Sequence, residues 1–67
     1  MHTLPESFNP SSLVGVIRRF GELGPAYQVT GIVKNGTLDQ TILRIHVLES
    51  KEDAEYPALL ALQDPKA

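Results

Sequence analysis

The sequence predicts a mainly β protein. We expect a small antiparallel meander of three to four strands, strongly bent or barrel-like and SH3-like in size, with one short C-terminal helix. Two observations lead to this expectation. Segments rich in Val, Ile and Tyr recur between residues 13 and 56, separated by turns that contain Gly or Asn. One short leucine-rich run, residues 58–63, follows a proline near the end of the chain. The length of 67 residues fits a single domain.

The first element, residues 13–20, has two interpretations. Its Val, Ile and Phe residues and the internal Gly15 favour a strand. The alternative is a helix, with Asn9-Pro10 at its start and apolar residues at i, i+3, i+4 and i+7. The residues before it are rich in proline and serine and show no period. We therefore expect residues 1–12 to be a flexible N-terminal arm and residues 13–67 to be a single small β-rich domain.

Two central strands, residues 27–33 and 40–48, follow with an Asn35-Gly36 turn between them. Alternation places on the buried faces Tyr27, Val29 and Val33 of the first strand and Leu43, Ile45 and Val47 of the second. Gln28, Thr30 and Ile32, and in the second strand Arg44 and His46, fall on the opposite faces.

The register of this hairpin excludes a tight two-residue turn. Such a turn would set Val29 opposite Ile42, so that the buried face of one strand meets the polar face of the other. We predict a longer loop or a bulge instead. Val29 is then expected opposite Ile45, and Gly31 opposite Leu43.

The C-terminal third predicts a charged turn, a strand and a helix. Residues 49–53 form the turn, and residues 54–56 are expected to pair back on Val47 as a short fourth strand. Pro57 suits the start of a helix over 58–63, and Asp64-Pro65 ends it. Leu59 and Leu62 are three residues apart and are expected to cover the open end of the sheet.

The composition argues against catalysis and bound cofactors. The chain has no cysteine, which excludes disulfides and thiolate metal sites. His46 is the only plausible general base, and no orienting carboxylate or glycine-framed nucleophile is visible beside it. The acidic residues after position 48 lack the glycine of a calcium loop. We expect no enzyme activity, no catalytic residue, no metal and no cofactor.

The leucines of the predicted helix are the first binding candidate. Leu59, Leu60 and Leu62, with two alanines, are more apolar residues than one buried side of a six-residue helix needs. Leu4 and Phe8 of the N-terminal arm extend this candidate. A domain of this size buries little core and gains from association. We expect a protein partner, either a second copy in a homodimer or a different protein.

The arginines are the second candidate. If the first three strands are adjacent, Arg18 and Arg44 share a face, and Arg19 adds to the positive charge. Small barrels bind single-stranded nucleic acid through basic faces with aromatic residues. The net charge of −2 and the four aromatic residues weaken this alternative.

Several short runs resemble a family of short uncharacterised bacterial proteins. They are Arg18-Arg19-Phe20-Gly21, residues 24–29, residues 44–49, Glu55-Tyr56-Pro57 and Asp64-Pro65. The resemblance extends from about residue 13 to residue 65 and implies a bacterial cytoplasmic setting, but no activity. The sequence has no apolar run long enough to cross a membrane and no basic leader, so we expect no membrane contact. The expectation is a small cytoplasmic bacterial interaction or regulatory module.

Overall fold

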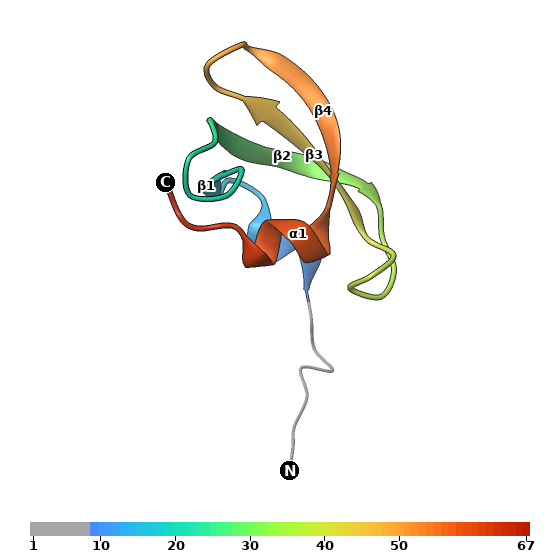
Figure 1. Ribbon diagram of the computed structural model, residues 1–67. Coiled ribbons are helices and arrows are strands. Elements are labelled where there is room, and N and C mark those ends of the chain that lie inside the picture. The colour runs from blue at the N-terminus through green and yellow to red at the C-terminus, as the bar shows by residue number, and fades with distance from the viewer. Residues whose placement is uncertain (1–8) are drawn as a thin grey trace.

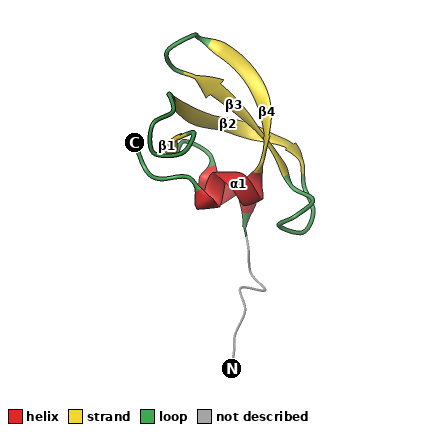
Figure 2. Cartoon of the chain, viewed as in Figure 1, coloured by secondary structure: helices red, strands yellow, loops and turns green. Residues whose placement is uncertain are grey.

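A computed structural model describes residues 9–67, which form one four-stranded antiparallel sheet with two short helices. The strands are β1 (Ile17–Arg19), β2 (Ala26–Lys34), β3 (Ile42–Val47) and β4 (Glu52–Pro57), and they lie in the sheet in sequence order. A 3-10 helix, η1 (Pro10–Leu13), precedes them and α1 (Ala58–Gln63) follows. Both helices lie together at one end of the sheet (Figures 1 and 2). The mainly β class with a short C-terminal helix is confirmed.

Strands β2 and β3 pair as predicted at one end and differently at the other. Val29 lies opposite Ile45, as expected. Thr30 then forms a bulge, so Gly31 pairs with Arg44 and not with Leu43. The sequence predicted a longer loop or a bulge, and the hairpin has both, but the predicted pairing of Gly31 with Leu43 is wrong because the bulge lies between Val29 and Gly31. One extra residue reverses which side chains face inward.

The reversal changes the expected faces of the second half of β2. Ile32 now lies opposite Leu43 and packs against the core, although alternation placed it outward. Val33 falls at a second irregularity and is 40% exposed, although alternation placed it inward. The prediction for these two residues is wrong because strict alternation takes no account of bulges.

The connection from β2 to β3 is a longer loop, as the register required. It extends over residues 35–41 and ends at the buried Thr41. The Thr41 hydroxyl donates to the carbonyl oxygens of Gly36 and Thr37, at 3.1 and 2.8 Å. The loop is therefore closed by its own hydrogen bonds.

The N-terminal element matches neither interpretation of residues 13–20 in full, because the helix ends at Leu13 and the strand covers only Ile17–Arg19. Asn9 caps η1, its side chain accepting from the Ser11 amide, and Pro10 occupies the first position. The strand is only three residues long, so the prediction of a strand over all of 13–20 is wrong. Gly15 separates the two elements because its φ of +94° is a left-handed conformation that side chains disfavour. Of the expected arm, residues 1–8 lie outside the described part, and Pro10 is buried.

Strand β4 is longer than predicted and pairs along the whole of β3. The three residues expected in it, 54–56, lie opposite Ile45, Arg44 and Leu43. Glu52, not one of those three, is the partner of Val47. The predicted pairing on Val47 is therefore wrong, because the turn is tighter than residues 49–53.

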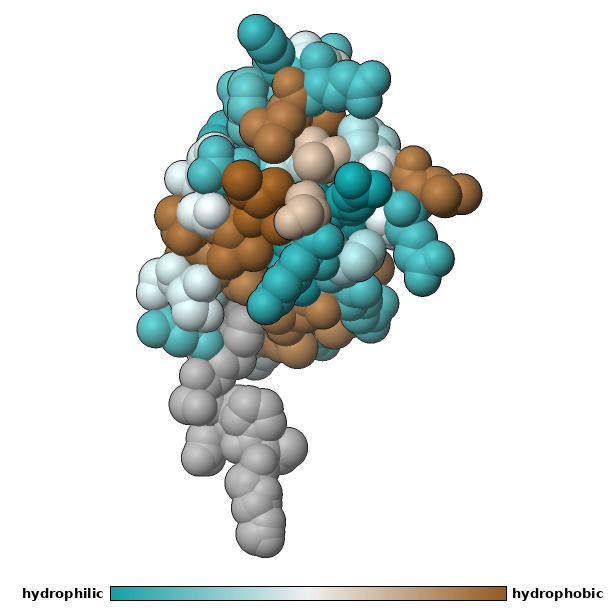
Figure 3. Space-filling model, turned by 90° about the vertical axis from the view of Figure 1, so that its left-hand side faces the viewer, coloured by the Kyte–Doolittle hydropathy of each residue, from teal (hydrophilic) through white to brown (hydrophobic). Residues whose placement is uncertain are grey.

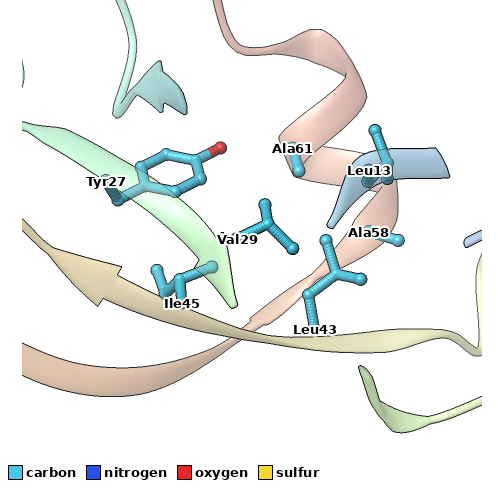
Figure 4. Packing of buried hydrophobic residues seen from close by; sticks show 7 residues of the cluster. All are labelled: Leu13, Tyr27, Val29, Leu43, Ile45, Ala58 and Ala61. Carbon is cyan, nitrogen blue, oxygen red and sulfur yellow. The ribbon is translucent and has the colours of Figure 1, made fainter. Parts of the chain in front are cut away.

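Helix α1 has the predicted bounds but presents a different face to the sheet. Ala58 and Ala61 are fully buried, whereas the leucines of the helix are partly exposed. The expectation that Leu59 and Leu62 cover the sheet is wrong, because small residues let the short helix approach the strands closely. Figure 4 shows the cluster that results. Its members are Leu13, Tyr27, Val29, Leu43, Ile45, Ala58 and Ala61.

The last residues return to the first strand. The Arg19 amide donates to the Pro65 carbonyl at 3.0 Å, and the Ala67 amide donates to the Ile17 carbonyl at 3.3 Å. Arg18 and Lys66 form an antiparallel bridge. Residues 65–67 thus cover the outer edge of β1, which leaves β4 as the uncovered edge of the described sheet.

Candidate functional site

The candidate binding surface consists of the three leucines of α1, which we call the leucine surface: Leu59, Leu60 and Leu62. Their exposed fractions are 38%, 43% and 39%. Ala58 and Ala61, three residues apart on one side of the helix, make the contact with the sheet. The leucines occupy the remaining directions. A helix that is apolar almost all round is normally buried on more than one side.

The surroundings of the leucine surface are also apolar in part. Within α1 the only polar residue is Gln63, and the helix has no charged side chain. Leu13 of η1 packs in the same cluster as the two alanines of α1, so the two helices are neighbours (Figure 4). Elsewhere, apolar side chains gather between hydrophilic ones on the face that Figure 3 shows. The leucine surface is therefore one of several exposed apolar regions, and it is the one built on a helix.

A polar centre lies directly beside this surface, at the residue that ends α1. One carboxylate oxygen of Asp64 accepts from the hydroxyls of Tyr27 and Tyr56, at 2.7 and 2.8 Å. The other oxygen accepts from the Gly21 amide at 3.3 Å. The Asp64 amide donates to the carbonyl oxygens of residues 60 and 61, which ends the helix. Asp64 thus joins α1 to β2, β4 and the β1–β2 turn.

The two tyrosines of this centre belong to an aromatic cluster with Phe20. Its ring centroid lies 4.5 Å from that of Tyr27 and 5.2 Å from that of Tyr56. Burial, with the hydrogen bond to the Asp64 carboxylate, raises the pKa of the Tyr56 phenol to about 12. The same causes raise the pKa of Tyr27 above its ordinary value. Both phenols therefore act as hydrogen-bond donors at neutral pH.

Arg18 also belongs to this centre and is not part of a basic face. It pairs with Tyr27 across β1 and β2, so its side chain is on the inner side, where Nη1 donates to the Asp64 carbonyl at 2.9 Å. Its buried Nε has no hydrogen-bond partner within the described residues. Arg19 and Arg44 alternate with inward-facing residues of their strands, so their side chains lie on the outer face and are exposed. The first three strands are adjacent, as the prediction required, but Arg18 and Arg44 do not share a face.

The outer face of the sheet carries paired charges of both signs. His46 and Asp53 lie opposite each other in β3 and β4, and their side chains form a contact of 2.9 Å. Arg44 lies opposite Glu55 in the same hairpin. The sequence shows no carboxylate near His46, because Asp53 reaches it only through the β3–β4 register. Among the described residues, no Ser or Thr hydroxyl is hydrogen-bonded to His46.

Sequence reasoning also missed the polar centre. Asp64 was assigned only the role of ending the helix, and the hydroxyls of Tyr27 and Tyr56 were given no partner. One signal was present: tyrosine hydroxyls require hydrogen-bond partners when they are buried, and Tyr27 was expected on an inward position. The carboxylate that serves both is distant in sequence from Tyr27.

Two further properties concern metals and membranes. Over residues 9–67, no group of three His, Asp or Glu side chains is placed to hold a metal ion. The helices described in that range are both too short to cross a bilayer.

Comparison of the sequence with protein-family models finds a matching family. A model of a family of unknown function, DUF5397, matches residues 2–67, which is nearly the whole chain. The chain belongs to this family. The DUF5397 assignment confirms the predicted resemblance to a family of uncharacterised short proteins. No curated protein matches the sequence.

Proposed function

We propose that this DUF5397 protein is a small, non-catalytic protein-binding or regulatory module that uses the leucine surface to contact its partner. The partner is a second copy of the chain or a different protein. The proposal includes a barrel-like bending of the sheet and a bacterial cytoplasmic setting. The observation that supports it most is the exposure of about two fifths of each of the three leucines on a six-residue helix.

Burial of the exposed leucine surface against a partner would contribute favourable free energy to binding. Full burial of a leucine side chain is worth roughly 1.5–3 kcal/mol. The fold itself leaves part of this energy unused at three neighbouring positions. Leu59 and Leu62, three residues apart, share one side of α1, and exposed apolar groups that lie together are typical of contact sites.

Pairing of strand edges is the other way in which a small sheet associates, and the charges argue against it for two copies. The edge of β1 is covered by residues 65–67. The free edge, β4, contains Glu52, Asp53 and Glu55 and no basic residue. Two β4 strands paired antiparallel would bring these carboxylates together, and like charges on facing strands are destabilising. This favours the leucine surface over edge pairing.

The extent of the leucine surface limits what it can bind. The exposed fractions of its three side chains add up to about one fully exposed leucine. A stable interface buries roughly 800 Å² on each partner. The leucine surface is therefore the apolar anchor of a weaker contact or of a larger interface, and it suits a short apolar segment of a partner.

Nucleic-acid binding through Arg18, Arg19 and Arg44 remains the second candidate, with less support. Arg18 is engaged with Asp64 on the inner side. Arg19 and Arg44 lie on an outer face that also carries Asp53 and Glu55. Carboxylates within a face repel phosphates. We therefore rank this candidate below protein binding.

The test compares two leucine-to-glutamate changes that add the same charge. Leu60→Glu places it in the leucine surface, and Leu23→Glu places it at a fully exposed position in the β1–β2 turn. We expect wild type and Leu23→Glu to associate in concentration-dependent sedimentation, or to retain a common protein from a lysate of the source organism. We expect Leu60→Glu to lose that association at least tenfold, which is about 1.4 kcal/mol.

Circular dichroism of each variant shows that the fold is intact before binding is compared. If the chain is monomeric at high concentration, self-association is excluded and only a different partner remains. If Leu60→Glu and Leu23→Glu behave alike in both measurements, the leucine surface is not the contact site.

A further inference from the structure

We propose that the free edge of β4 is a second binding site, which accepts an extended, basic segment of a partner protein as an additional strand of the sheet. This site is separate from the leucine surface, so it holds or fails independently of the proposed function. The backbone of β4 supplies the hydrogen bonds, and its carboxylates select the partner.

Strand β4, the orange strand of Figure 1, has a neighbour on one side only. The strand order is β1-β2-β3-β4, so β4 pairs with β3, and nothing within residues 9–67 pairs with its other side. The opposite edge of the sheet is covered by residues 65–67. A free strand edge presents a row of unpaired backbone N–H and C=O groups, which is a template for pairing with another chain. An added strand therefore has one place in the described sheet, beside β4.

The register of β3 and β4 identifies the backbone groups that point to the open side. The Ala58 amide donates to the Thr41 carbonyl at 3.0 Å, and every second residue pair of an antiparallel ladder is hydrogen-bonded in this way. Counting back from that pair, residues 56, 54 and 52 bond to β3. Asp53 and Glu55 occupy the alternate positions, so their N–H and C=O groups point away from β3.

Two further observations agree with this assignment. The Arg44 carbonyl accepts from the Thr30 hydroxyl of β2 at 3.2 Å, so the backbone of Arg44 faces away from Glu55, which lies opposite it in β4. Pro57, which has no N–H, also falls at a position where β3 receives no hydrogen bond. The outward groups of Asp53 and Glu55 are hydrogen-bonded to no other part of the described chain.

The side chains of this edge favour a basic partner. Residues 52–55 are all exposed, and β4 contains Glu52, Asp53 and Glu55 with no basic residue. Asp53 and Glu55 are two residues apart and lie on the same face of the sheet. Within the described residues Glu55 forms no ion pair, and that of Asp53 is with His46. Lys or Arg at alternate positions of an added strand would lie opposite both carboxylates, whereas a second copy of β4 would bring like charges together.

Ala54 indicates what the added strand carries between its basic residues. It lies between the two carboxylates in β4 and faces the other side of the sheet, opposite the buried Ile45. Ala54 itself is exposed, and its small side chain leaves space for an apolar neighbour on an added strand. The occupant is therefore an extended segment in which basic residues alternate with apolar ones.

The experiment measures amide hydrogen exchange of the full chain with and without a synthetic hexapeptide of alternating lysine and valine. In the free chain, we expect the amides of Asp53 and Glu55 to exchange on the order of tenfold faster than those of Ala54 and Tyr56, which are bonded to β3. The peptide should slow the first pair and leave the second pair little changed. Slow exchange in β2 and β3 shows that the chain is folded.

Two glutamate changes separate the edge from the overall charge. Glu55→Gln removes a carboxylate from the edge, and Glu22→Gln removes one from the exposed β1–β2 turn, beside the opposite edge. We expect Glu55→Gln to weaken peptide binding roughly threefold to fivefold, as for loss of a cross-strand ion pair, and Glu22→Gln to have little effect. A peptide with its three lysines before its three valines should bind more weakly, because it lacks the alternation.

Three results would each overturn the proposal. Slow exchange of Asp53 and Glu55 in the free chain would mean that the edge is already paired. Unchanged exchange of these two amides at saturating peptide would mean that no strand is added. Equal effects of Glu55→Gln and Glu22→Gln would mean that the peptide responds only to net charge. The association test with Leu60→Glu does not involve β4, so the failure of either idea leaves the other standing.

Discussion

Helix α1 and the residue that ends it differ in how their side chains are used. Asp64 has a hydrogen-bonded carboxylate, amide and carbonyl, and its partners outside α1 come from β1, the β1–β2 turn, β2 and β4. The three leucines just before it leave about two fifths of their surface in solvent. The polar centre thus stabilises the fold through its hydrogen bonds, whereas the exposed parts of the leucines make no contact within the fold. The comparison indicates that stability depends on the first region and binding on the second.

The largest effect is expected from removing the shared acceptor. Asp64→Ala leaves the hydroxyls of Tyr27 and Tyr56 without the carboxylate, and Tyr27 is fully buried. Unpaired buried donors cost on the order of 1–3 kcal/mol each. We expect the free energy of unfolding to fall by about 3 kcal/mol, measured by urea denaturation.

Asp53→Ala is the matched control, because this aspartate also accepts a hydrogen bond but lies on the surface, with 67% of its side chain exposed. We expect it to cost less than about 1 kcal/mol. Equal costs for the two aspartates would show that the polar centre is no more important for stability than a surface pair.

The pH dependence of stability also distinguishes the polar centre from the leucine surface, without a substitution. The pKa of Tyr56 is raised to about 12 and that of Tyr27 is also raised, whereas an unfolded tyrosine titrates near pH 10. The folded state therefore holds protons that the unfolded state releases. Stability should be fully present below about pH 10 and fall as pH rises toward 12, by at most about 1.4 kcal/mol per pH unit for each tyrosine.

Urea denaturation at several pH values between about 9 and about 11 measures this slope. Tyr56→Phe should make it shallower, because one of the two titrating phenols is gone. The leucine variants should leave the slope unchanged. A slope that Tyr56→Phe does not alter would mean that other groups, such as the lysines, cause the loss of stability.

Much of the sheet was predictable from residue patterns. The bounds of α1 follow from Pro57 and from Asp64-Pro65, which start and end helices for local reasons. The pairing of Val29 with Ile45 follows from matching two apolar faces. Both are consequences of short-range geometry or of a simple two-fold period.

The features that were missed depend on contacts between distant residues. The bulge at Thr30 reversed the faces of Ile32 and Val33. Gly31, the next residue, marks a bend in the strand, but it does not specify how many residues the register shifts. Asp64 meets Tyr27 only because residues 64–67 return to β1. The choice of alanines for the buried face of α1 depends on how closely the helix approaches the sheet, which its apolar pattern does not reveal.

The central claim is that α1 stabilises the fold with its alanines and leaves its leucines for binding. One substitution at two positions tests it most directly: Leu43→Ala in the core and Leu60→Ala in the leucine surface. Unfolding free energy and association are measured for both. We predict that Leu43→Ala costs about 3 kcal/mol, whereas Leu60→Ala costs less than about 1 kcal/mol and weakens association. If Leu60→Ala destabilises the chain as much as Leu43→Ala and leaves association unchanged, the leucine belongs to the core and the account is wrong.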